Sequence, residues 1–445
     1  MTTERPPPTI AILPWGDAIE DFLETANISL DQFCCEMTGG WLFGYGEALK
    51  LNQCETVFIC FSTSVSKAET RENPRTGSKV LLLPSPTTHR FARKLARALE
   101  RRCSHAKLRR IAPLLTILHQ TASSLASYLA TDPLALARAL KAHRVSHLIC
   151  QEYEYTRFDV CVLLSRLLGI PVFASFQGGS VTASRLESWI RPLTVRWADG
   201  LIVAPRQERR RVITTYSVPP SQLHDIPNPL DTELWKPLEN KASLREKHGL
   251  PPAATIAVWH GRVAIHTKGL DTLLRAWASV AAAAVAEAPL LLLIGNGSDR
   301  EKLRALIDCH APESVRWIDR YILDRSHMRE LLNSADFYIF PSRREGFPVA
   351  PTEAMACGLP VIATTASGVP DIFPHGEASG GILVPPDDSP ALARGMTRLL
   401  QDPELRKALS ANARQQVIQS FSLKSIGTRL KQTLTAPTVP RNPIL

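Results

Sequence analysis

A chain of 445 residues is too long for one ordinary hydrophobic core and suits two α/β domains. Hydrophobic residues make up 44% of the chain and charged residues 21%, which is the composition of a soluble globular protein. The longest small and apolar stretch, residues 278–294, is interrupted by Glu287 and Pro289. It therefore predicts a helix followed by a strand and excludes a membrane span.

The cysteines and the first residues favour a cytoplasmic protein. The nine cysteines are an odd number and include no C-x-x-C pair, which indicates a reducing compartment and argues against zinc. The first eight residues, Met-Thr-Thr-Glu-Arg-Pro-Pro-Pro, contain no apolar segment, so no secretory signal is visible.

Short apolar runs alternate with helical patterns along the whole chain, which predicts βα units and parallel sheets. In the first half, strands are expected at residues 9–13, 56–61, 80–83, 147–150, 171–175 and 201–204. In the second half they are expected at 255–259, 290–294, 315–318, 337–340, 360–363 and 382–384.

Asn-Pro and other proline-rich dipeptides at residues 226–231 mark a linker, and we expect the hinge near residues 236–248. The predicted domains are residues 1–236 and 249–420. Residues 421–445 are expected to form a last helix and a mobile tail, because the final ten residues hold several prolines.

The most informative segment is residues 345–362, in which two carboxylates, Glu345 and Glu353, stand eight residues apart. Glu345 follows the strand at 337–340, at the strand end where open α/β sheets bind ligands. Glu353 lies near the start of the next helix, whose backbone N–H groups attract anions. Carboxylates that bond hydroxyls beside a phosphate-binding helix end suit a nucleotide sugar.

This segment resembles the E-x7-E motif of retaining glycosyltransferase family 4, with its E-G-x-P and E-A-M-A-x-G-x-P-V-I surroundings. The resemblance implies the GT-B fold, in which two Rossmann-like, doubly wound parallel-sheet domains face each other across a cleft. It also implies that the final helix returns to the first domain. Glu345 would then be catalytic, and the donor would contact a set of neighbouring residues: Gly346, Phe347, Pro348, Val349 and Glu353.

Two further loops of the second half fit this resemblance. Arg262 and Lys268 resemble the family's G-R-x(n)-K-G segment, which implies that these cations hold the diphosphate and stabilise its growing charge. Gly295 and Gly297 follow the strand at 290–294 and give a loop that the donor can approach closely. Asp319 replaces a usual glycine near the nucleobase, so the base stays undetermined.

Arginines at positions 343 and 344 precede Glu345 and have two interpretations: added positive charge near the phosphates, or solvated surface. In the first half, Thr38-Gly39-Gly40-Trp41 is expected in the loop after the first strand. There it resembles the family's glycine-rich loop, which implies contact of Gly39 and Gly40 with the donor.

On the acceptor side, relatives have a histidine at the position of Gln177, beside the reacting sugar. A glutamine forms hydrogen bonds but does not titrate, so an acid–base role there is in doubt. Glu152 and Glu154 follow the strand at 147–150 and are the best candidates to bind the acceptor hydroxyl. The alternative is an internal ion-pair network with Arg157.

The resemblance implies that a sugar, expected to be a hexose, moves from a nucleoside diphosphate sugar to an acceptor hydroxyl with retention of anomeric configuration. The leaving phosphate itself would take the acceptor proton. No cofactor or metal is expected, because the chain holds neither D-x-D nor H-E-x-x-H. The acceptor is a lipid, a glycan or a small natural product. The alternatives are a nucleotide-sugar epimerase of the same fold and a catalytically silent, sugar-binding scaffold partner.

Much of the net charge of +10 is concentrated at residues 90–110, which hold nine Lys or Arg against one acid, Glu100. Phe91, Leu95 and Leu99 recur every four residues, so one helical face would be apolar and flanked by arginines. This pattern is typical of contact with an anionic membrane surface, here the inner face of a membrane. The alternative is a surface helix whose apolar stripe packs on the first domain. No aromatic platform accompanies the charges, so no nucleic acid is expected as a partner.

Overall fold

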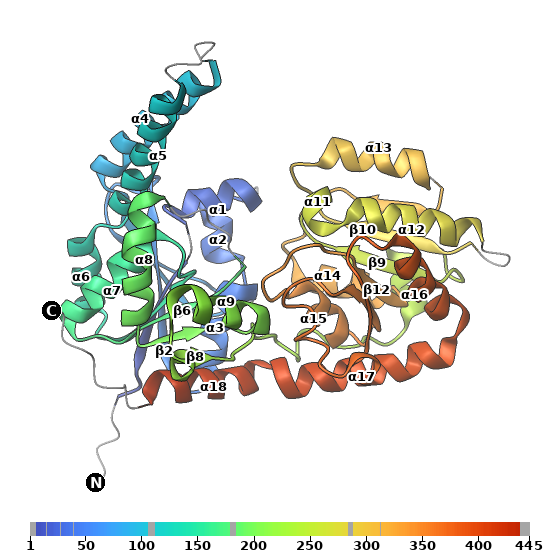
Figure 1. Ribbon diagram of the computed structural model, residues 1–445. Helices are drawn as coiled ribbons and strands as arrows, with labels where there is room; N and C mark the ends of the chain where they lie inside the picture. Colours follow the sequence, from blue (N-terminus) through green and yellow to red (C-terminus); the bar gives the residue numbers. More distant parts are fainter. Residues whose placement is uncertain are drawn as a thin grey trace, which may run out of the picture.

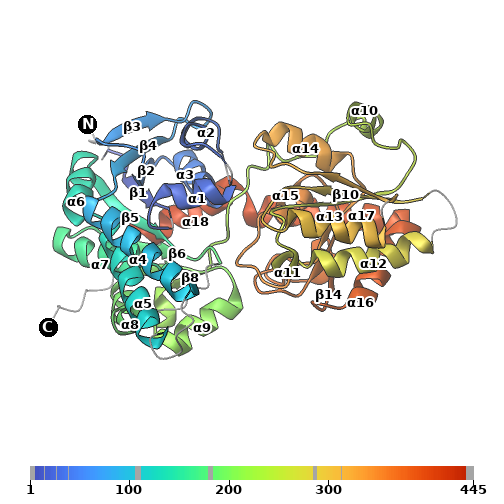
Figure 2. The ribbon, with the colours of Figure 1, turned by 90° about the horizontal axis from the view of Figure 1, so that it is seen from above.

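The computed structural model describes residues 6–14, 16–26, 28–38, 40–105, 112–178, 184–283, 288–311 and 313–436. Two α/β domains lie side by side, and two consecutive helices run along the bottom of both in Figure 1. Each domain has one sheet with helices on both faces, as Figure 2 shows from above.

The sheet of the first domain has the strand order β3-β4-β2-β1-β5-β6-β7-β8. Only β3 is antiparallel to its neighbour among the strands of this sheet. The strands are β1 (Thr9–Leu13), β2 (Glu55–Ser62), β3 (Glu69–Glu72), β4 (Lys79–Pro84), β5 (Val145–Gln151), β6 (Val172–Ser175), β7 (Gly200–Ile202) and β8 (Leu223–His224).

Successive residues of these strands point into two separate cores. Ala11 and Leu13 of β1 pack into one core, whereas Ile10 and Ile12 pack into the other. The helices of the first core are α6 (Pro133–Ala142), α7 (Thr156–Leu168), α8 (Arg185–Trp197) and α9 (Arg206–Tyr216). Those of the second are α1 (Ile19–Ala26), α2 (Leu30–Cys35), α3 (Gly40–Leu51) and the last helix, α18 (Leu423–Thr435).

Two helices of the first domain contribute none of their described side chains to either core. The hairpin of α4 (Thr87–His105) and α5 (Ala112–Leu129) extends beyond the body of the domain at the top of Figure 1. It lies on the opposite side from the two helices that run along the bottom of both domains.

The sheet of the second domain is entirely parallel, with the order β11-β10-β9-β12-β13-β14. Its strands are β9 (Ile256–His260), β10 (Leu290–Ile294), β11 (Val315–Ile318), β12 (Phe337–Phe340), β13 (Val361–Thr364) and β14 (Gly381–Val384). The strand order reverses between β9 and β12, so their carboxyl ends form the crevice where such sheets bind ligands. The corresponding point in the first sheet lies between β1 and β5.

The helices of the second domain also form two layers. One layer has α12 (Leu270–Ala282), α13 (Arg300–His310) and α16 (Ser389–Gln401); the other has α14 (Arg325–Asn333), α15 (Ala350–Ala356) and α17 (Pro403–Phe421). Two short helices, α10 (Lys241–Lys247) and α11 (Ile265–Lys268), precede α12 along the chain. The two doubly wound sheets confirm the predicted fold class.

All twelve predicted strands are present, most within one or two residues of the expected bounds. The sequence did not indicate β3 or β8. β3 is the polar, largely exposed segment Glu-Thr-Arg-Glu, which carries no apolar alternation. β8 has only two residues, too few for a pattern.

The chain crosses between the domains within the predicted linker at residues 226–231, before the expected hinge. At Leu230 the backbone pairs with Ser422, so the outward and return crossings lie side by side. Trp235 is already buried in a core of the second domain, and Arg245 of α10 forms an ion pair with Asp336 there. Residues 236–248, predicted as the hinge, therefore pack on the second domain, because Lys241 and Arg245 both form ion pairs with Asp336.

The return crossing places α18 against α3 of the first domain, with Ile426, Leu430 and Leu434 fully buried. The approach is close at Gly427, where an added Cβ atom would lie 2.1 Å from the carbonyl oxygen of Ala48. This contact has no room for a methyl group.

We predict that Gly427→Ala lowers the midpoint of thermal unfolding. Alanine usually stabilises a helix interior relative to glycine, but here overpacking against α3 costs about 1–3 kcal/mol. The control is Gly395→Ala in α16, where the nearest atom to the new Cβ lies at an ordinary 3.4 Å. The control midpoint should stay or rise; a Gly427→Ala midpoint that also stays or rises would contradict the assigned packing.

Candidate functional site

An ion pair joins the loops after β9 and β12, the two strands at the switch point of the second sheet. Lys268 Nζ lies 2.6 Å from Glu345 Oε1, and both side chains are largely buried. Lys268 ends α11, and Glu345 lies in the loop between β12 and α15. The structure thus brings together two of the three residues that the sequence predicts to be catalytic.

The second carboxylate of the motif, Glu353, lies in the first turn of α15 and has two basic partners. His260 Nε2 is 3.0 Å from Glu353 Oε2, and Arg325 Nη1 is 3.4 Å from Oε1. The hydroxyl of Tyr338 donates to the carbonyl oxygen of His260 and its ring stands edge-on to the imidazole, which fixes the end of β9. The sequence did not indicate His260 and Arg325 as partners of Glu353, because both lie far from it along the chain.

Glu353 lines a cavity of about 110 Å³ between the domains. Met37 and Thr38 line it from the first domain, and residues after β9, β10 and β11 line it from the second. Its lining includes four groups from the second domain that can contact a ligand: His260, Gly295, Tyr321 and Arg325. The cavity is the candidate donor pocket, because residues that end or follow β9, β10 and β11 line it together with Glu353 of the motif.

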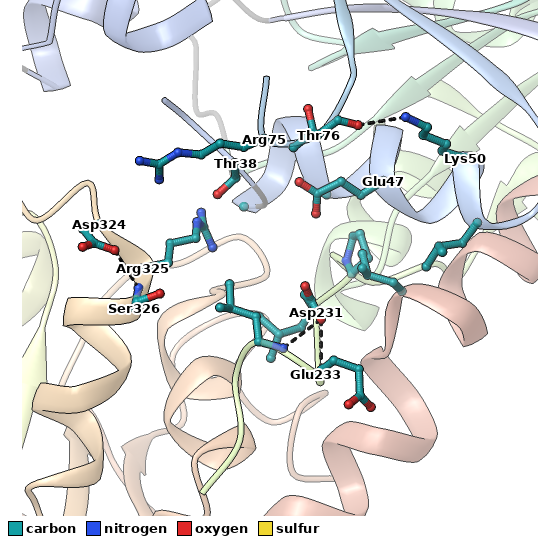
Figure 3. Close-up of a pocket in the computed structure, with 17 residues that line it drawn as sticks. Thr38, Glu47, Lys50, Arg75, Thr76, Asp231, Glu233, Asp324, Arg325 and Ser326 are labelled. Carbon is teal, nitrogen blue, oxygen red and sulfur yellow. Dashed lines mark hydrogen bonds between the residues drawn. The ribbon is translucent and has the colours of Figure 1, made fainter. Parts of the chain in front are cut away.

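A larger cavity of about 620 Å³ adjoins it and shares Thr38 and Arg325 with it. Figure 3 shows Glu47 of α3 and Arg75 above this cavity, with Asp231 of the crossing segment and Arg325 below. Gly40 lines it, and a Cβ atom there would lie 3.7 Å from Arg325 Nη2.

The glycine-rich segment of the first half therefore faces the second domain, although it was placed wrongly along the chain. Helices α1 and α2 separate it from β1, and Gly40 is already the first residue of α3. Both helices are short, with eight residues in α1 and six in α2. Gly39 lies outside the described residues.

Gly295 and Gly297 allow neighbouring loops to touch. A Cβ atom on Gly295 would lie 1.9 Å from the carbonyl oxygen of Gly261, and one on Gly297 would lie 2.2 Å from that of Val263. These glycines hold the loop after β10 against the loop that leads to Lys268. Any contact of theirs with a donor stays a prediction.

The basic residues near the motif divide into structural and available groups. Arg343 donates two hydrogen bonds to Asp271 and pairs with Asp387, so it ties loops together. Burial would raise the pKa of Asp271, but its bonds to Arg343 outweigh burial and lower that pKa. Arg262 and Arg344 are exposed and have no ion pair within the described parts of the chain.

The side chains after Glu345 mainly build the core. Phe347 is buried, and its ring packs edge-on against Phe421 with centroids 5.6 Å apart. Pro348 is buried, and Val349 precedes the first residue of α15. These predicted donor contacts are therefore available mainly through the backbone of the loop.

The loops of the two domains meet at Gly178 and Gly346. A Cβ atom on Gly346 would lie 2.6 Å from the Cα atom of Gly178, and Asn228 Nδ2 donates to the carbonyl oxygen of Phe347. Gln177 thus stands next to the motif loop, and its backbone N–H donates to Glu152 Oε2 at 3.1 Å.

The two predicted acceptor-side glutamates have different surroundings. Glu152 is buried and adopts φ +69°, an uncommon conformation for a glutamate, beside the Gln177 loop. Glu154 accepts hydrogen bonds from Arg211 and from the hydroxyl of Tyr216. The ion-pair network considered for Glu154 therefore exists with Arg211 and not with Arg157, which donates to backbone carbonyls of Pro14 and Asp17.

Within the described ranges, no three His, Cys, Asp or Glu side chains gather as a potential metal site. None of the helices described is long and apolar enough to cross a bilayer.

Two family models match consecutive parts of the chain. "Glycosyltransferase Family 4" matches residues 89–234, and "Glycosyl transferases group 1" matches residues 240–416. The match boundary lies just after the crossing at Leu230, so each model corresponds to one domain.

Curated relatives include an MMP alpha-(1->4)-mannosyltransferase of Mycolicibacterium hassiacum, 28% identical over 59% of this chain and 64% of that protein. Another is the GDP-mannose-dependent monoacylated alpha-(1-6)-phosphatidylinositol monomannoside mannosyltransferase of Corynebacterium glutamicum, 30% identical over 53% of this chain and 62% of the relative. The chain thus spans less than two thirds of the length of these two relatives.

Solved structures share the fold over nearly the whole chain. Sucrose-phosphate synthase from Thermosynechococcus elongatus has a TM-score of 0.66 at 19% identity, covering 96% of this chain and 98% of that one. Anabaena HepE in complex with UDP and glucose has a TM-score of 0.65 at 15% identity, covering 96% and 100%. From the two family models and this shared fold, the chain belongs to the family 4 glycosyltransferases of the GT-B fold.

Proposed function

We propose that the protein transfers a hexosyl group from a nucleoside diphosphate sugar to an acceptor hydroxyl, with retention at the anomeric carbon and without a metal. The observation that carries the proposal is the placement of Lys268, Glu345 and Glu353 together at the switch point of the second sheet. The same crevice is closed by the Gln177–Gly178 loop of the first domain, so a sugar there would meet both domains.

The cations stabilise the leaving group in this mechanism. Negative charge grows on the diphosphate as the glycosidic bond breaks, and fixed cations in a site that excludes water lower the barrier. Lys268 is paired with Glu345 before the donor binds, and the diphosphate then competes with Glu345 for its ammonium group. Arg262 is exposed and has no ion-pair partner in the described residues, so it is available for the second contact.

The carboxylates orient the sugar nucleotide. Glu353 is held by His260 and Arg325, so its oxygens keep one direction while they accept bonds from donor hydroxyls. In this mechanism the leaving phosphate accepts the proton of the incoming hydroxyl, so Gln177, which does not titrate, is not required as a base. An epimerase would need a group that moves protons at this position, which makes that alternative the weaker one.

The name of one relative favours an acceptor class, and the free cysteines favour a cellular location. The name of the Corynebacterium relative states a GDP-mannose donor and a phosphatidylinositol mannoside acceptor, which favours lipids or glycans as acceptors here. We expect the enzyme to act in the cytoplasm, where nucleotide sugars are available and thiols stay reduced; the eight described cysteines are free.

Incubation with UDP-sugars and GDP-sugars in excess EDTA tests the proposal. We expect slow donor hydrolysis, and transfer once an acceptor is added, at the same rate with and without EDTA; proton NMR should show an anomeric coupling that matches the donor. Inversion would refute retention, and activity that only magnesium or manganese restores would refute metal independence. An epimerised donor would support the epimerase, and an unchanged donor would support the silent scaffold.

We predict that Glu353→Ala mainly raises the KM for the donor, whereas Glu345→Ala mainly lowers kcat. Each lost bond between a carboxylate and a sugar hydroxyl costs about 1.5–3 kcal/mol. The matched control is Glu301→Ala on α13, an exposed glutamate of the same domain. Steady-state kinetics with both variants measure the effect, and wild-type constants in both would refute the site.

We also predict that Lys268→Ala and Arg262→Ala each lower the rate at least about 100-fold, similar to the loss of one oxyanion donor. Lys407→Ala, at an exposed lysine of α17 in the same domain, is the control and should keep nearly full activity. If either Lys268→Ala or Arg262→Ala reacts at the wild-type rate, the diphosphate binds elsewhere.

A further inference from the structure

The α4–α5 hairpin exposes the apolar residues that a packed helix pair would bury. Phe91 is 72% exposed and Leu95 is 47% exposed on α4, one turn apart on the same face. On α5, Ile117, Leu118 and Leu125 are each about half exposed. The alternative in which the α4 stripe packs on the first domain therefore fails for Phe91 and Leu95.

Small residues and histidines form the inner seam of the hairpin. Ala92 and Ala96 of α4 and Ala126 of α5 are buried. His89 Nδ1 lies 2.8 Å from the carbonyl oxygen of Ala126, and His119 Nδ1 lies 3.0 Å from that of Ala96. The helices are therefore held together by close backbone approach, which leaves the large apolar side chains outside.

The charge on the hairpin is strongly one-sided. Residues 87–129 contain nine Lys or Arg and a single acid, Glu100. Of the basic side chains described, Arg93 pairs with Asp21, whereas Lys94 and Arg97 are exposed and have no ion pair in the described residues. α5 has no charged residue at all. Helix α4 is thus basic with exposed apolar residues, whereas helix α5 is uncharged.

We propose that the α4–α5 hairpin docks the protein on an anionic lipid bilayer, with Phe91, Leu95 and the exposed residues of α5 in the interfacial layer. Lysines and arginines attract anionic headgroups while the apolar side chains enter the acyl boundary. A second copy of this chain is a poor occupant, because two such hairpins would bring a formal charge of +8 against +8.

The hairpin and the acceptor-side residues lie in the same domain, and from this we infer the class of acceptor. It belongs to the first domain, which carries Glu152 and Gln177, and it lies opposite the crossing helices α17 and α18 (Figure 1). Docking there leaves the crossing helices clear of the bilayer. Together with the proposed glycosyl transfer, on which this step rests, it assigns a lipid or lipid-linked acceptor.

Co-sedimentation of the full chain with sucrose-loaded vesicles tests docking directly. Vesicles of phosphatidylcholine and phosphatidylglycerol in equal parts should bind the protein at low salt, and binding should weaken at high salt. Vesicles of phosphatidylcholine alone should bind at least about tenfold less, because the basic residues then lack anionic partners. Equal, negligible binding to both kinds of vesicle at low salt would overturn the proposal.

Two double variants test separately how the apolar and the basic residues of the hairpin contribute to vesicle binding. Phe91→Glu with Leu95→Glu, and Lys94→Glu with Arg97→Glu, should each reduce anionic-vesicle binding at least about tenfold. The matched control pair is Ile418→Glu with Lys407→Glu on α17, both exposed, and it should bind like wild type. Wild-type binding by both hairpin variants, with the control unchanged, would place the contact elsewhere and overturn the proposal.

Amide hydrogen exchange is measured on the wild-type protein, so this test does not depend on whether the variants fold. Amides at residues 87–105 and 112–129 should exchange more slowly with anionic vesicles than without, and the second domain should be unchanged. Slower exchange of these amides with rising protein concentration alone would indicate a second copy and refute the bilayer. Vesicle binding without donor turnover would refute the proposed function only; turnover without binding would refute the docking only.

Discussion

The contact between Gly178 and Gly346 sets the geometry on which the site depends. Two backbones from different domains pass so closely that neither residue has room for a Cβ atom. This contact brings the carboxyl end of β6 against the loop after β12, so the motif of one domain and Gln177 of the other share one crevice. Asn228, at the crossing, adds a hydrogen bond to the Phe347 carbonyl and stabilises the same approach.

Within that crevice the charged groups neutralise one another while no substrate is bound. Lys268 with Glu345, and Glu353 with His260 and Arg325, are half-buried or buried pairs whose desolvation is offset by their partners. In the proposed function, a donor with two phosphates and several hydroxyls offers replacements for each of these bonds. On that proposal, donor binding exchanges the partners of these side chains and leaves no buried charge unpaired.

Outside the crevice, the basic residues fall into two groups that differ in whether they have acidic partners. Arg343 is tied to Asp271 and Asp387, and Arg211 to Glu208 and Glu154, so these arginines hold loops and helices together. On the α4–α5 hairpin the described basic residues mostly lack acidic partners, and apolar side chains lie exposed beside them. The pairs of Arg343 and Arg211 thus stabilise the fold, whereas the basic residues of the hairpin, next to exposed apolar side chains, are suited to an external ligand.

The sequence alone determined the strands and the motif, because both are local. A buried parallel strand is a short apolar run whatever lies around it, and the spacing of Glu345 and Glu353 follows from one loop and one helix. The apolar patterns in the sequence did not indicate β3, which is polar. They also did not indicate α1 and α2, which separate Gly40 from the first strand.

Only the tertiary structure decided which side chains meet. His260, Arg325 and Glu353 come from three separate elements, and Glu154 found Arg211, 57 residues away, and not the nearby Arg157. The crossing at Leu230 was likewise fixed by the packing of Trp235 and Arg245 on the second domain. The exposure of Phe91 and Leu95 depends on whether another surface covers them, and a periodic pattern reads the same in either case.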